Sequence, residues 1–113
     1  MELKRLSQEI IAGTYDELLE EWQKIFNPMG ATCELYEENI LVHFPDVTEK
    51  AIALPGVFEM RKVDMHLFDY SESPENRDWS VGPVVDEPAI VKKEGNRWVR
   101  VKKGKVSSQK IKF

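Results

Sequence analysis

The apolar residues of this chain change their spacing once, near residue 30, and that change limits what the chain can fold into. Between Thr14 and Asn27 they recur at helical spacing, so a helix here has one apolar face: Leu18, Leu19, Trp22, Ile25 and Phe26. From residue 31 onward, apolar and polar residues alternate, which is typical of half-buried strands. Helices followed by strands predict an α+β fold with the helices on one face of an antiparallel sheet.

The sequence predicts two helices within residues 1–28. The second begins at Thr14, whose hydroxyl can accept a hydrogen bond from the amide of Glu17 while the Glu17 carboxylate reaches back, as in a capping box. Asn27-Pro28 ends this helix, because proline disfavours helical backbone in the residue before it. Leu3, Leu6 and Ile10 mark a shorter apolar stripe for the first helix.

Residues 31–113 are predicted to supply a mostly antiparallel sheet of five to seven strands that ends in a three-strand meander. Residues 31–70 are expected to form strands: a hairpin over 31–44, a strand over 48–54, and a long strand over 57–70 with a bulge near Arg61-Lys62. Three prolines and a glycine make residues 71–88 a long loop. Residues 89–113 are the predicted basic meander, with turns at 94–96 and 103–104.

The 113 residues suit a single globular domain over 1–113. Cys33 stands alone, so no disulfide can form within the chain, which favours a reducing compartment. No apolar run approaches the roughly 18 residues that a membrane span needs. We therefore expect a cytoplasmic protein that does not bind membranes, and a homo-oligomer is possible.

Charge is unevenly divided along the chain. Residues 89–113 hold nine of the sixteen Lys and Arg residues but only one acidic residue, Glu94. If Val99 and Val101 face the core, strand alternation turns the intervening residues to the other face. One sheet face would then carry an aromatic ring among cations, a candidate partner-binding site: Trp98, Arg100, Lys102, Lys92, Lys110 and Lys112.

Other interpretations of this charge stay open. Lysines on edge strands guard against aggregation, and the basic meander can instead pair with the acidic helices of the same chain. Cations around a stacking ring also suit single-stranded nucleic acid. The chain as a whole is acidic, which weakens that alternative because phosphate binding depends on positive potential.

Few residues suggest catalysis. Asp64 and His66 share a face if they lie on a strand, and with His43 they supply two imidazoles and a carboxylate for a divalent metal. Chance spacing explains them more simply, so no metal, cofactor or catalytic residue is expected. Cys33 is expected to be a buried structural thiol. In the long loop, Arg77 and Trp79 either form a binding tip or pack back on the sheet.

Gly56-Val57-Phe58-Glu59, after a helix and a short β segment, resembles a stretch of small phage head–tail joining proteins, and we transfer no function from four residues. The leading hypothesis is a non-enzymatic protein-interaction protein: an inhibitor, an immunity or anti-defence factor, or a subunit of a larger assembly such as one of a phage or mobile element. One alternative is a small-molecule-binding or enzymatic cone-shaped α+β fold, by analogy with cystatin-like and nuclear-transport-factor-like folds. Another is single-stranded nucleic-acid binding through the basic C-terminal meander.

Overall fold

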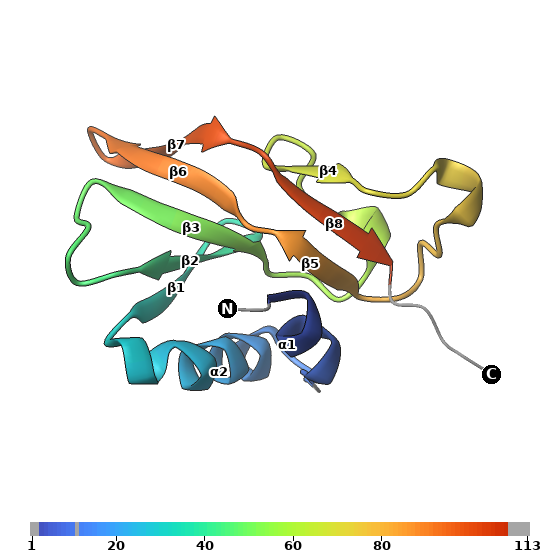
Figure 1. Cartoon of the computed structure of the whole chain (residues 1–113), viewed down its shortest axis with the longest axis horizontal. Coiled ribbons are helices and arrows are strands. Elements are labelled where there is room, and N and C mark those ends of the chain that lie inside the picture. The colour runs from blue at the N-terminus through green and yellow to red at the C-terminus, as the bar shows by residue number, and fades with distance from the viewer. Residues whose placement is uncertain (1–2, 11, 109–113) are drawn as a thin grey trace.

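The computed structural model describes residues 3–10 and 12–108. Within them two helices, α1 (Leu3–Glu9) and α2 (Tyr15–Phe26), precede eight strands (Figure 1). The strands are β1 (Thr32–Tyr36), β2 (Asn39–His43), β3 (Lys50–Pro55), β4 (Phe68–Tyr70), β5 (Pro83–Glu87), β6 (Ala89–Glu94), β7 (Arg97–Lys102) and β8 (Gly104–Ser108). Three short 3-10 turns lie between them: η1 (Asn27–Met29), η2 (Met60–Lys62) and η3 (Pro74–Asn76). None of the described helices has the length and apolar character needed to cross a membrane.

Helix α2 begins and ends where the sequence predicts. The hydroxyl of Thr14 accepts a hydrogen bond from the amide of Glu17 at 3.1 Å. The Glu17 carboxylate accepts from the amide of Gly13 at 2.8 Å, one residue earlier than a capping box predicts. The apolar face of α2 is buried at Leu18, Trp22 and Phe26. The described part of the first helix is short, because α1 ends at Glu9.

The strands form two sheets. The larger has five antiparallel strands in the order β1-β2-β3-β6-β7, and the smaller has the order β4-β8-β5, in which β4 and β8 run parallel. Helix α2 packs against β1 and α1 packs against β5 (Figure 1). The predicted α+β class, with helices on one face of an antiparallel sheet, is confirmed.

Residues 57–67 correct the predicted long strand. They form η2 and a turn, and only Phe68–Tyr70 joins a sheet, as β4. Val57, Met60 and Val63 are buried against the five-stranded sheet, so their apolar character reflects core packing by an irregular segment. The predicted 71–88 loop is also too long, because residues 83–87 form β5.

The last strand differs from the predicted meander. The β6–β7 hairpin forms with Gly95 at a positive φ of 61°, but β8 pairs with β4 and β5. Gly104 is a site of close backbone contact: a Cβ there would lie 2.5 Å from the Glu87 carbonyl oxygen. The Lys103-Gly104 pair therefore marks a bend where β7 continues into β8 alongside β5 and β6.

The two faces of the five-stranded sheet carry separate core clusters. On the helix side, Ile40, Val42 and Leu54 pack with the buried residues of α2. On the other side, Leu41, Ala51, Ala53, Ala89 and Val91 pack with residues 57–68 and with Val106 of β8. Both faces of this sheet are therefore covered over part of their area.

The five-stranded sheet is strongly curled. Strands β1 and β7 are its opposite edges, yet the Trp98 amide of β7 donates to the Tyr36 hydroxyl of β1 at 3.4 Å. The rings of Trp98 and His43 lie 5.2 Å apart between centroids. Because these residues share a face with Leu41 and Val91, that face is concave, and we call it the concave face.

Candidate interaction surface and pockets

Strand register divides the predicted basic site between the two faces of the sheet. Arg100 lies opposite Val91 and Trp98 opposite Lys93, on the concave face. Lys92 lies opposite Val99, on the helix side. The prediction that Trp98 and Lys92 share a face is therefore wrong, and Trp98 packs on the concave-face core. The predicted Lys110 and Lys112 lie outside the described residues.

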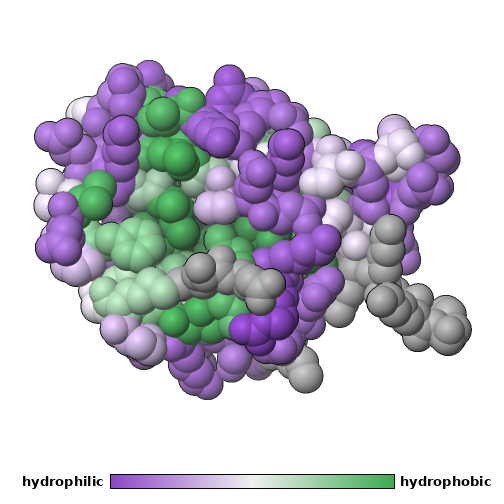
Figure 2. All heavy atoms as spheres, viewed as in Figure 1, coloured by the Kyte–Doolittle hydropathy of each residue, from purple (hydrophilic) through white to green (hydrophobic). Residues whose placement is uncertain are grey.

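Among residues 3–10 and 12–108, the helices leave the β3–β6–β7 part of their side of the sheet open. Across it, Ile52 lies opposite Ile90, Ile90 opposite Lys102, and Lys50 opposite Lys92. We define the uncovered face as the half-buried Ile52, Ile90 and Val99 with the exposed Lys50, Lys92 and Lys102. Figure 2 shows hydrophobic side chains in a band that runs from β7 across β6 and β3 towards the helices, with hydrophilic side chains around it. The surface is therefore apolar at its centre and cationic around it.

Within the described part of the chain, Lys92 is the one lysine of this face in an ion pair. Lys92 pairs with Glu94 of its own strand at 3.3 Å, and both side chains are about half exposed.

Val101 is 47% exposed and has no opposite residue, because the register between β6 and β7 shifts there. Such an irregularity weakens the outer edge of β7 as a template for another strand. A partner is therefore more readily accommodated on the uncovered face than along the β7 edge.

Other cations of the predicted basic region hold the fold together. Lys103 pairs with Asp69 of β4 at 3.2 Å, which links the β7–β8 bend to the smaller sheet. Arg100 donates from Nη1 to the carbonyl oxygen of His66 at 2.9 Å, which ties β7 to the turn before β4. These two contacts are made with β4 and the turn before it, and not with the acidic helices.

Arg77 and Trp79 pack back on the smaller sheet. The Arg77 guanidinium lies 3.6 Å from the centroid of the Tyr70 ring and 4.7 Å from that of Trp79. The rings of Tyr70 and Trp79 meet edge to face at 5.2 Å, and Trp79 remains 38% exposed. Desolvation raises the pKa of Tyr70, and the nearby Arg77 charge partly opposes this. The two residues thus anchor the loop, while a role in partner binding stays a prediction.

The loop that carries them is fastened at several further points. Glu72 accepts a hydrogen bond from the Ser108 amide at 2.6 Å, and the Ser108 hydroxyl accepts from the Asp78 amide at 3.2 Å. The hydroxyl and amide of Ser80 both donate to Asp78, and these bonds hold the pKa of its carboxyl below the usual value. These contacts fasten the loop, which projects at one end of the molecule, to the smaller sheet (Figure 1).

Asp64, His66 and His43, the trio considered for a metal ion, do not come together. Asp64 and His66 lie at a turn before β4, where the Asp64 carboxylate accepts from the His66 amide at 2.9 Å. His43 lies elsewhere, with its Nε2 atom 3.1 Å from a carboxylate oxygen of Glu34. Within the described residues no group of three or more His, Cys, Asp or Glu side chains is arranged to hold a metal ion.

Asp64 and His66 instead line a pocket of about 220 Å³ on the concave face, which we call the concave-face pocket. Its other wall comes from β1, β2, β6 and β7, on the same face as Trp98. The pocket combines aromatic, acidic and basic side chains. It is lined by Tyr36, Glu37, Asn39, Leu41, Asp64, His66, Leu67, Val91, Trp98 and Arg100.

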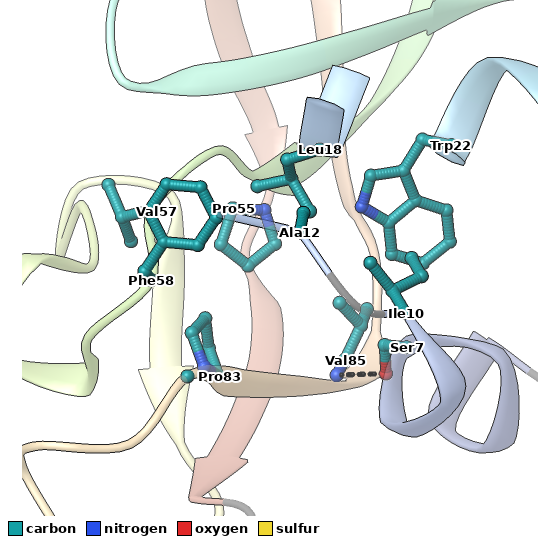
Figure 3. Close-up of a pocket in the computed structure, with 11 residues that line it drawn as sticks. Ser7, Ile10, Ala12, Leu18, Trp22, Pro55, Val57, Phe58, Pro83 and Val85 are labelled. Atoms are coloured by element: carbon teal, nitrogen blue, oxygen red, sulfur yellow. Dashed lines mark hydrogen bonds between the residues drawn. The ribbon is translucent and has the colours of Figure 1, made fainter. Parts of the chain in front are cut away.

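A second space, of about 250 Å³, lies between the helices and the sheets. Figure 3 shows Trp22 and Leu18 on one side and Phe58, Pro55 and Val57 across from them, with Pro83 and Val85 of β5 below. The Ser7 hydroxyl in its lining donates a hydrogen bond to the Lys4 carbonyl at 3.0 Å. It also accepts one from the Val85 amide at 3.0 Å (Figure 3). A space therefore exists between helices and sheet, but Asp64 and His66 do not line it.

Cys33 is partly buried on the helix side of β1, next to the core that α2 closes. Desolvation raises the pKa of its thiol to about 11. A thiol with so high a pKa is a poor nucleophile near neutral pH. Its surroundings agree with the predicted structural thiol.

None of the protein families, curated proteins or solved structures compared with this chain matches it. The site is thus defined by geometry alone.

Sequence reasoning missed Ile52 and Ile90. Their pattern is that of ordinary core residues, and only the structure shows that the helices do not extend over them. It also missed Asn39 and Glu37, whose positions in the concave-face pocket depend on the curl of the sheet.

Proposed function

We propose that this protein is a non-enzymatic interaction protein that binds another protein through the uncovered face. The observation that carries the proposal is a half-buried apolar centre, Ile52, Ile90 and Val99, with lysines beside it in the strand register. Interfaces commonly combine an apolar centre with a polar rim. The partner expected here therefore has an apolar patch bordered by Asp or Glu side chains.

A second copy of the same chain fits this surface less well. A twofold contact would place the same patch on both sides and so bring Lys50, Lys92 and Lys102 near their own counterparts. Like charges facing each other across an interface are unfavourable. An acidic partner instead meets these lysines with complementary charge and gains association rate from long-range attraction.

Single-stranded nucleic acid is also less well matched. Binding of that kind uses aromatic rings on which bases stack within a cationic groove. The aromatic ring that the sequence offered for this role, Trp98, lies on the concave face, away from Lys92 and its neighbours. The uncovered face offers aliphatic side chains instead, which suit a protein surface.

The test is a photo-crosslinking capture. A benzophenone amino acid replaces Ile90, and proteins captured from a lysate of the source cells, with nuclease added, are then purified and titrated against the wild-type chain. Capture is followed by affinity measurements on Ile90→Ser and Lys92→Glu. We expect each change to weaken binding by roughly tenfold, because the first removes apolar contact and the second opposes an acidic rim.

The control is Lys62→Glu, which reverses an exposed charge on η2, on the opposite side of the sheet. It should leave affinity unchanged, and added salt should weaken wild-type binding. The proposal fails if Ile90→Ser and Lys92→Glu, both folded by circular dichroism, bind the captured protein as the wild type does. It also fails if the crosslinked species is only a second copy of this chain.

A further inference from the structure

The concave-face pocket is lined by two carboxylates that have no cationic partner. Glu37 and Asp64 both line it, and within the described residues no side-chain nitrogen of Lys, Arg or His lies within 4 Å of either carboxylate. The Asp64 carboxylate accepts hydrogen bonds from the His66 amide and from Asn39. Arg100 lines the same pocket, but its guanidinium donates to the His66 carbonyl oxygen. The formally charged groups of the lining are therefore Glu37, Asp64 and Arg100, two carboxylates against one guanidinium, with His66 and Tyr36 beside them.

Asn39 adds an unsatisfied hydrogen-bond acceptor to this pocket. Its side chain is directed towards Asp64, to which Nδ2 donates at 3.1 Å, and the residue is only 1% exposed. The Oδ1 atom of Asn39 has no hydrogen-bond partner in the described structure. A buried acceptor left unpaired is unfavourable. Asn39 therefore holds the Asp64 carboxylate in the pocket wall at a cost in stability.

The backbone at Glu37 is unusual in a way that agrees with this. Glu37 lies in the tight turn between β1 and β2 with a φ of 56°, a left-handed conformation that favours glycine. Among the described residues it is the one non-glycine residue with positive φ. Retaining a glutamate there costs stability, and strained residues of this kind concentrate at binding sites.

Aromatic rings complete the wall. Trp98 and Tyr36 both line the pocket, and the Tyr36 hydroxyl accepts a hydrogen bond from the Trp98 amide, which fixes them together. The Trp98 ring is supported by the His43 ring at 5.2 Å. The face of a tryptophan or tyrosine ring attracts a cation. Acidic, amide and aromatic groups thus meet around one small space.

We propose that the concave-face pocket binds an organic cation, an ammonium or guanidinium group, held by Glu37 and Asp64 and stacked against Trp98. The same chemistry is supplied by a free small amine and by a Lys or Arg side chain of a protein. The pocket lies on the opposite face of the sheet from the uncovered face, so this proposal stands or falls separately from the proposed function.

The test titrates the full chain with capped amino acids and follows amide and indole resonances by NMR at low salt. The probes are Nα-acetyl-arginine methylamide and Nα-acetyl-lysine methylamide. Nα-acetyl-citrulline methylamide is the neutral match for arginine, and Nα-acetyl-glutamate methylamide is the anionic control. We expect the cations to shift the Trp98 indole resonance with a dissociation constant of about 1–10 mM and to bind at least about fivefold more tightly than citrulline.

Variants locate the site. Glu37→Gln and Asp64→Asn should each weaken binding of the arginine probe about fivefold or more, because each removes one negative charge from the pocket. Glu38→Gln, the neighbouring residue in the same turn, does not line the pocket and should bind as the wild type does. Thermal melts of all three variants check that they are folded.

Comparison of agmatine with the capped arginine identifies the source of the cation. Tighter binding of agmatine indicates a free amine, and tighter binding of the capped residue indicates a protein side chain. Equal binding of citrulline and arginine, preference for the glutamate probe, or no shift at Trp98 up to 50 mM would each overturn the proposal. An anionic preference would still leave the partner-binding face untouched.

Discussion

The two faces of the five-stranded sheet are closed in different ways. On the helix side, large residues of β2 and β3, such as Ile40 and Leu54, meet the regular apolar stripe of α2 at Trp22 and Phe26. On the concave side, the small Ala51, Ala53 and Ala89 let the irregular 57–67 segment come close. Helix α2 covers a limited strip of the sheet and leaves β6 and β7 open. The irregular 57–67 segment fits closely against the sheet, but the concave-face pocket remains at its end.

The packed strip under α2 and the concave-face pocket also differ in how well their polar groups and backbone are accommodated. The packing under α2 contains the large buried rings of Trp22 and Phe26, and the Ser7 hydroxyl of α1 is paired with the Val85 amide of β5. The concave side contains the strained Glu37 and the unpaired Asn39 oxygen. Strained backbone and unpaired polar atoms are more common at binding sites than in regions that only pack.

The strongest way to test this contrast is to remove the ring that closes the helix side. Trp22 is 2% exposed and stacks on Phe26 with 6.1 Å between ring centroids. Trp22→Ala should lower the free energy of unfolding by about 3–5 kcal/mol, because it leaves a large cavity. Urea unfolding followed by circular dichroism measures this. A loss below about 1 kcal/mol would show that the helices contribute little to closing this face.

Enlarging a small residue on the concave side tests the other half of the comparison. Ala53 is fully buried against residues 57–68, so Ala53→Leu should cost about 1–3 kcal/mol through overpacking. The adjacent Ile52 points to the uncovered face, and Ile52→Leu should change stability by less than about 1 kcal/mol. Thermal melts of the two variants compare them, and equal losses would contradict the assignment of the two faces.

Relief of the strain in the β1–β2 turn should change the free energy of unfolding by a smaller amount, and should raise it. Glu37→Gly should raise the free energy of unfolding by about 1 kcal/mol, since glycine adopts positive φ without a steric cost. The same change should weaken binding of the arginine probe in the concave-face pocket. The control is Glu38→Gly in the same turn, which lacks positive φ and should not stabilise. A destabilised Glu37→Gly variant would show that the carboxylate serves the fold.

The smallest effect on stability concerns Cys33 and alkaline pH. Its pKa in the folded chain is about 11, above the ordinary value of 9.0, so the unfolded chain releases this proton first as the pH rises. Stability contributed by the neutral thiol is therefore present below pH 9 and is lost as the pH rises towards 11. Urea unfolding at pH 8 and pH 10 should show a larger loss for the wild type than for Cys33→Ala.

The regular elements were the predictable part of the fold. Thr14, Asn27 and the apolar face between them gave the bounds of α2, because capping and periodicity act within one turn. The alternation over 31–44 and the turn at Gly95 gave both hairpins for the same reason. Met60 and Val63 looked like strand residues, because an irregular segment buried by distant strands has no local signal.

The candidate sites were predictable only as residue types. Trp98, Arg100, Lys92 and Lys102 were identified from the sequence, but their faces were not, since both Trp98 and Val99 are apolar and either one can point inward. The sheet curls so that Tyr36 at one edge reaches Trp98 at the other. This curl turns Trp98, and not Val99, towards the concave face. That curl depends on contacts between strands far apart in sequence, which a periodic pattern does not encode.

The bend at Gly104 has a consequence for how this chain folds. Strands β5 and β6 form one long stretch, strands β7 and β8 form another, and the turn at Gly95 joins the two. Pairing of β6 with β7 that starts at this turn can therefore extend past the bend into pairing of β5 with β8 in the second sheet. The strands it joins are neighbours in sequence, so loop closure there costs little entropy. This ribbon is then the natural nucleus for both sheets, and the backbone amide protons of β6 and β8 should exchange with solvent most slowly.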